Sequence, residues 1–271
     1  MPPAPSGPPA NPAGVPPAAA APPATVLGLR GRQWMVVAAA LASCYLMMSA
    51  VALTGSYAML NREPTNAELQ WAAKAEVARR WQVWPSGRIF PERVAYTVRR
   101  EKSELASRTG IVPQTGCDTA VDPEYTAVLR RHGCRAILRA TYADQLQGIV
   151  VTVGVVAFPD EWRADKAMRA LPGTPDEDRS GGVRPALRAS PFPGTASARF
   201  TDAARQDRTV TREGPYVLLT TSGYADGRPA EAITKKRPGR PFGLASELAF
   251  AISKPLATQA LPDCSKREWR C

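Results

Sequence analysis

The chain has 271 residues and a formal net charge of +11 at pH 7. Its single histidine and five cysteines leave few ligands for a metal centre, so neither a metal nor a cofactor is predicted. The excess of basic residues fits an anionic partner, and composition alone does not choose among lipid headgroups, wall polymers and nucleic acid.

The N-terminal segment, residues 1–33, is rich in proline and alanine. It holds ten prolines by residue 23, no acidic residue, and two charges, at Arg30 and Arg32. Such a composition buries too little apolar surface to offset the entropy of ordering, so we expect a disordered cytoplasmic tail. The tail would act as a spacer, as a ligand for a proline-binding module, or as an inert extension.

Residues 34–60 contain no charged side chain. About 20 helical residues cross the hydrocarbon core of a bilayer, so this segment predicts a transmembrane helix and makes the lipid bilayer the first expected partner. Small residues at helical spacing, such as Ala38 and Ala42, would allow two such helices to pair in a homo-oligomer.

Two other interpretations of the apolar segment remain open. A cleavable signal peptide would use sites such as 50–52, and a lipoprotein signal would acylate Cys44. The long preceding tail argues against the first, and the apolar residues 45–54 argue against the second. We therefore expect a single-pass plasma-membrane protein with a cytoplasmic N-terminus, although the arginine and lysine bias beside the span is small.

Beyond the span, the number of cysteines is even, which fits an oxidising compartment. We predict two disulfides, each closing a short loop: Cys117–Cys134 and Cys264–Cys271. The spacings do not match a zinc site, and the alternative is four reduced thiols in the cytosol. The pairing places residues 88–271 outside the cytoplasm.

The helix signals of this region are local. Thr65 and Glu68 form a capping box, which predicts a juxtamembrane helix from residue 66 to about 81, within residues 61–87. Residues 122–124 (DPE) begin a second helix, which ends at 130–132, where the helix dipole favours cations. His132 therefore has a structural explanation, and catalysis by it is not expected.

The strand signals define the fold class. Residues 88–99 indicate an edge strand interrupted by Pro91. Two hairpins follow, 135–143 with 149–158 and 208–212 with 215–224, each followed by a helix, 161–171 and 243–260. The long connection 172–207 is expected to be irregular. The sequence thus predicts an α+β domain over 88–271, an antiparallel sheet with helices on one face.

The sequence contains one candidate binding surface and no recognisable catalytic motif. The basic cluster KKRPGR is a candidate anion or partner contact, through Lys235, Lys236, Arg237 and Arg240. No serine elbow, phosphate loop or base beside a nucleophile is present. We predict no catalytic residue and do not expect an enzyme, and nucleic acid is not an expected partner.

The tail, the span and the stretch from Gly133-Cys134 to Pro159-Asp160 carry a resemblance. The chain resembles single-pass membrane proteins of high-GC actinobacteria, which combine a proline- and alanine-rich cytoplasmic tail, one anchor and a two-disulfide outer domain. Its order of elements is also similar to that of extracytoplasmic sensor domains of mycobacterial receptor kinases. The chain has no kinase domain, and no ligand residue carries over.

These observations favour a membrane-anchored, non-catalytic extracytoplasmic module of the cell envelope that binds or scaffolds. Its expected partner is another envelope protein or an anionic wall or lipid polymer. The alternatives are a small-ligand sensor domain, an envelope lipoprotein, and an enzyme that uses carboxylates.

Overall fold

The computed structural model describes residues 25–26, 29–60, 62, 65–98, 102–173, 183–230, 242–260 and 263. The chain divides into two compact units, Met1–Glu63 and Pro64–Cys271. The first 24 residues of the predicted tail lie outside the described residues.

The first unit contains one long helix, α1 (Gly31–Leu60), in which no residue is buried. It begins three residues before the predicted span and ends with it, and it is long and apolar enough to cross a membrane. A short antiparallel pair, β1 (Thr25–Val26) and β2 (Leu29–Arg30), precedes it. Both strands lie within residues 1–33, the segment that the sequence predicted to be disordered.

The second unit begins with helix α2 (Asn66–Val83), and its predicted capping box is present. The backbone N–H of Thr65 donates to Glu68 Oε2 at 2.8 Å, and the Glu68 N–H donates to Thr65 Oγ1 at 3.4 Å. These two bonds satisfy donors that the first helical turn leaves unpaired, which fixes the start of the helix. A single turn, α3 (Ser86–Ile89), follows.

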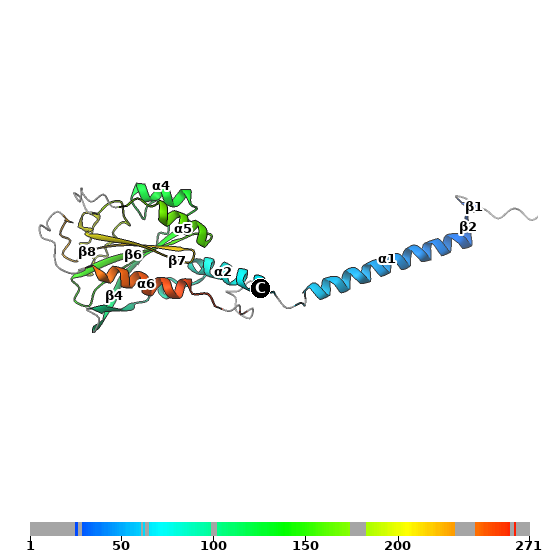
Figure 1. Ribbon diagram of the computed structural model, residues 1–271, viewed down its shortest axis with the longest axis horizontal. Coiled ribbons are helices and arrows are strands. Elements are labelled where there is room, and N and C mark those ends of the chain that lie inside the picture. The colour runs from blue at the N-terminus through cyan, green and yellow to red at the C-terminus, as the bar shows by residue number, and fades with distance from the viewer. Residues whose placement is uncertain are drawn as a thin grey trace, which may run out of the picture. The chain divides into compact units, whose positions relative to one another are not determined.

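A six-stranded antiparallel sheet forms the centre of this unit (Figure 1). The strand order is β3-β4-β5-β6-β8-β7, so β3 is an edge strand, as predicted. It begins after Pro91 and is not interrupted by it, because residues 88–89 belong to α3. The strands are β3 (Arg93–Val98), β4 (Lys102–Val112), β5 (Ala136–Ala143), β6 (Ile149–Ala157), β7 (Asp207–Glu213) and β8 (Tyr216–Tyr224).

Strand β4 was not predicted from the sequence. The larger apolar residues of its sequence fall in adjacent pairs, Leu105-Ala106 and Ile111-Val112, and therefore show no period-two alternation. The strand exists because β3 and β5 pair with its two edges. Its pairing with β5 shifts register between Arg108 and Gly110, so Thr109 is the extra residue of a β-bulge.

Helices cover both faces of the sheet, and the prediction of helices on one face was wrong (Figure 1). Helices α2 and α6 (Gly243–Ala257) pack on one face, whereas α4 (Pro123–Arg131) and α5 (Glu161–Ala170) pack on the other. The physical reason lies in β6 and β8. Every residue of β8 and all but the first of β6 are buried, so both faces of these strands need cover.

Residues 183–206, here called the strap, complete the cover on the α4 and α5 face. The strap lies within the predicted irregular connection, and it holds one 3₁₀ turn, η1 (Asp202–Ala204), and a single bridge from Leu187 to Val121. A Cβ atom on Gly154 would lie 2.6 Å from Leu187 Cδ1. The glycine in β6 therefore makes room for the strap.

Candidate functional site

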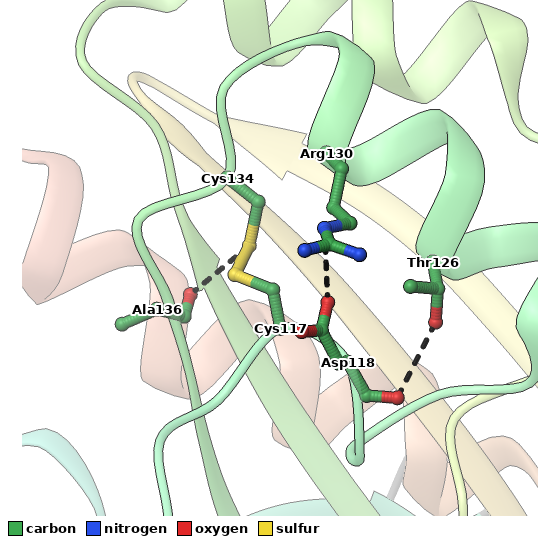
Figure 2. The surroundings of a disulfide bond; sticks show 6 residues. All are labelled: Cys117, Asp118, Thr126, Arg130, Cys134 and Ala136. Carbon is green, nitrogen blue, oxygen red and sulfur yellow. Dashed lines mark hydrogen bonds and ion pairs between the residues drawn. A yellow bond between two sulfur atoms is a disulfide. The ribbon is translucent and has the colours of Figure 1, made fainter.

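The disulfide Cys117–Cys134 joins the loop before α4 to the short connection between α4 and β5 (Figure 2). Its S–S bond is 2.01 Å long, and it closes a loop with a sequence separation of 17. The pairing agrees with the prediction from spacing. Beside it, Asp118 Oδ1 lies 3.2 Å from Arg130 Nε, in an exposed ion pair of the kind that contributes little to stability.

The other predicted site residues lie outside the described residues. They are Cys264, Cys271, Lys235, Lys236, Arg237 and Arg240. Cys44, the lipidation alternative, is a free and exposed thiol in α1.

His132 is the C-cap residue of α4, and Gly133 follows it with a φ of 82°. This is the helix end that the sequence predicted. Among the described residues, no three histidine, cysteine, aspartate or glutamate side chains form a group that could hold a metal ion.

A buried polar cluster lies beneath the strap. Asp122 is the N-cap residue of α4, but its side chain makes no capping hydrogen bond. Its Oδ2 atom instead accepts the Ala186 N–H at 2.9 Å and lies 3.1 Å from Nη1 of Arg205. Arg205 is fully buried, so its charge requires this carboxylate, which explains why the expected cap is absent.

Arg205 also fixes the backbone of the strap. Its Nη1 donates to the Leu187 carbonyl at 3.1 Å and its Nε to the Asp202 carbonyl at 3.0 Å. Asp202 Oδ1 accepts the Ala189 N–H at 2.8 Å and lies 3.7 Å from Arg205 Nη1. One cation therefore joins α4, the strap and its 3₁₀ turn in a single network.

A second buried arginine, Arg139 in β5, lies under the same strap. Its Nη1 donates to Ser190 Oγ at 3.2 Å. The Ser190 carbonyl accepts from Thr141 Oγ1 at 2.8 Å, and its N–H donates to Thr152 Oγ1 at 3.2 Å. Arg139 and Thr141 lie two residues apart in β5 and therefore share a face, and the strap covers that face.

A shallow polar groove of about 550 Å³ lies beside the β4 bulge. Two positions on its rim have positive φ, Gln147 at 55° and Gly194 at 76°. The residues that line it come from β4, the turn between β5 and β6, and the strap: Ser107, Arg108, Thr109, Ala143, Asp144, Gln145, Gln147, Gly194, Thr195 and Ala196.

The chemistry of this groove is that of a binding surface. Asp144 Oδ1 already accepts the N–H groups of Gly148 and Ile149, at 2.7 and 2.8 Å, and Arg108 donates to the Phe90 carbonyl. The hydroxyls of Thr109 and Thr195 and the amide oxygen of Gln145 are also hydrogen-bonded within the protein. The side chains of Ser107 and Gln147 are the hydroxyl and amide groups that the lining offers to a ligand. Among the described lining residues, no nucleophile lies beside a base.

Sequence reasoning missed the cluster beneath the strap and the polar groove. Arg205 and Asp202 lie in an irregular segment, so no periodicity identifies them. A signal for Arg139 was present, because a charged residue in a strand that pairs with an almost wholly apolar strand indicates that a partner for the charge should be sought.

Comparison of the chain with models of known protein families, with curated proteins and with solved structures found no match.

Proposed function

We propose that this protein is a membrane-anchored, non-catalytic binding or scaffold module of the cell envelope. Its tail lies in the cytoplasm and its α+β domain outside. The observation that carries the proposal is α1, a 30-residue apolar helix with no buried residue. So much apolar surface is costly in water, and a bilayer removes that cost.

The disulfide supports the proposed orientation. The bond between Cys117 and Cys134 lies in the second compact unit, beyond α1. Disulfides persist in oxidising compartments and are rare in the cytosol, so this unit fits the outer side of the membrane better than the inner side. The tail on the other side of α1 then lies in the cytoplasm.

The binding role draws on the polar surface of the domain. The groove beside the β4 bulge is polar and presents the side chains of Ser107 and Gln147, and such a concave surface favours the second candidate, a small-ligand sensor. An envelope protein or an anionic wall or lipid polymer is the partner that the basic composition favours.

Cysteine accessibility in intact cells tests the orientation. The full chain would carry Cys44→Ser, Cys264→Ser and Cys271→Ser, so that only Cys117 and Cys134 can be labelled by a thiol reagent. A membrane-impermeant maleimide should label them only after an impermeant reductant has been added. A Ser6→Cys change placed in the tail of a variant that lacks the other cysteines should be labelled only after the cells are permeabilised.

Two results would contradict the proposal. Labelling of positions 117 and 134 by a permeant reagent without reduction, combined with protection from the impermeant one, would place the domain in the cytosol. Recovery of the full chain in the soluble fraction, without detergent, would remove the membrane anchor.

A further inference from the structure

The side chain of Arg139 is buried without an ion-pair partner among the described residues. It is 8% exposed, its Nη1 meets the Ser190 hydroxyl, and its Nε has no hydrogen-bond partner. A buried charge costs free energy unless an opposite charge or several hydrogen bonds compensate it. One neutral hydroxyl does not compensate a guanidinium, so this position calls for an anion.

The charges around Arg139 leave a cation in excess. The cluster holds three arginines, at 139, 188 and 205, and two aspartates, at 122 and 202. Both aspartates lie within ion-pair distance of Arg205, at 3.1 and 3.7 Å. Arg188 Nε lies 4.0 Å from the second oxygen of Asp122. The carboxylates are therefore occupied, and the uncompensated charge falls on Arg139.

Electrostatics at Arg139 agree with this count. Burial lowers the pKa of its guanidinium, the positive charge of Arg188 lowers it further, and the negative charge of Asp202 acts in the opposite direction. The guanidinium of Arg188, in the strap, therefore acts on that of Arg139, in β5. Arg188 is 44% exposed, so the second group lies where solvent reaches it.

We propose that Arg139, Arg188 and the Ser190 hydroxyl form a binding site for a phosphate oxyanion. A guanidinium presents planar N–H donors that match two phosphate oxygens, and a second guanidinium with a hydroxyl completes a set of donors. The anion would neutralise the excess charge of the cluster. It would also hold the strap against β5, because two of the three groups belong to the strap.

This site extends the proposed function by naming a class of ligand. It rests on that proposal only for the side of the membrane on which the phosphate is bound. Free phosphate and a membrane or wall phosphodiester share the same chemistry. Binding to the purified full chain tests the site, whereas thiol accessibility tests the orientation. Failure of one experiment therefore does not resemble failure of the other.

The test is thermal unfolding and titration calorimetry of the full chain in micelles of an uncharged sugar detergent. Inorganic phosphate is one probe, and phosphatidylglycerol added to the micelles is the other. A ligand that binds the folded state raises the unfolding temperature. We expect this rise for wild type and for the charge-matched control Arg130→Gln. We expect binding about tenfold or more weaker in Arg139→Gln.

A purely structural Arg139 predicts a different pattern. Arg139→Gln would then lower the unfolding temperature in phosphate-free buffer while leaving the response to phosphate unchanged. The exposed variant Arg188→Gln gives a second measure, because it weakens the site without emptying a buried position. The proposed site is overturned if each probe raises the unfolding temperature of Arg139→Gln and Arg188→Gln as much as that of wild type. It is also overturned if neither probe raises the unfolding temperature of wild type. A response to one probe alone that depends on Arg139 supports it and identifies the source of the phosphate.

Discussion

Glu76 and Arg80 form a buried ion pair one turn apart on α2, with 2.6 Å between Glu76 Oε2 and Arg80 Nη2. The remaining terminal nitrogen of the guanidinium, Nη1, donates to the carbonyls of Pro255, Leu256 and Thr258, at 2.9, 3.0 and 2.7 Å. These carbonyls lie at the end of α6, where a helix leaves its last acceptors unpaired. The pair therefore fastens the first long helix of the domain to its last.

Arg80→Met should destabilise the domain strongly. The change leaves the Glu76 carboxylate buried without a partner and the end of α6 without donors, a loss of about 3–5 kcal/mol in the free energy of unfolding. Urea unfolding of the full chain in detergent, followed by tryptophan fluorescence, measures it. The neighbouring Arg79→Met is the control, and its change should stay below about 1 kcal/mol.

The double variant Glu76→Gln/Arg80→Met separates the two causes. It removes the stranded charge, so it should be more stable than Arg80→Met alone. If Arg80→Met unfolds at the same urea concentration as wild type, the pair does not hold α2 to α6.

The disulfide yields a second prediction. Replacing both partners, Cys117→Ser with Cys134→Ser, should lower the free energy of unfolding by about 3 kcal/mol, because the bond closes a loop of moderate length in the unfolded chain. Cys44→Ser, in the other compact unit, should leave the unfolding midpoint of the domain unchanged. Equal midpoints for the double variant and wild type would mean that the bond adds nothing to stability.

Local signals in the sequence predicted the elements that local contacts form. The capping box at Thr65 and Glu68 and the helix start at Pro123 each depend on near neighbours in the chain. The α+β class followed from the signals for two hairpins, each followed by a helix. The disulfide followed from the short spacing of two cysteines.

Contacts between segments that are distant in the sequence could not be predicted from such local signals. The partner of the Asp122 carboxylate is Arg205, which lies in a segment without periodicity, so the residue was interpreted as a simple helix cap. Strand β4 depends on its neighbours rather than on its own pattern. The basic cluster 235–240 and the pair Cys264–Cys271 stay predictions, since they lie outside the described residues.

The close contact between the strap and β8 predicts that one methyl group added to Gly223 lowers the stability of the domain. A Cβ atom on Gly223 would overlap the carbonyl oxygen of Ala204, a backbone atom of the 3₁₀ turn, and would lie 2.7 Å from Phe200 Cε2. Gly223→Ala should therefore destabilise the domain by about 1–3 kcal/mol. Gly148→Ala is the matched control, because no atom lies within 4 Å of its Cβ. Equal unfolding midpoints for the two variants would show that the strap does not press on β8.

The buried tyrosine of the edge strand predicts how stability changes at alkaline pH. Burial, together with the hydrogen bond that Tyr96 donates to Glu104 at 2.7 Å, raises the pKa of Tyr96 from 10.0 to about 12. The unfolded chain therefore loses this proton first, so the stabilisation is complete below pH 10 and is lost as pH rises towards 12. The free-energy difference between wild type and Tyr96→Phe should be constant at neutral pH and should shift against wild type across that interval. Because the other buried tyrosines are common to both proteins, their titration cancels. A difference that stays constant up to pH 12 would show that the phenol titrates alike in the folded and unfolded chains.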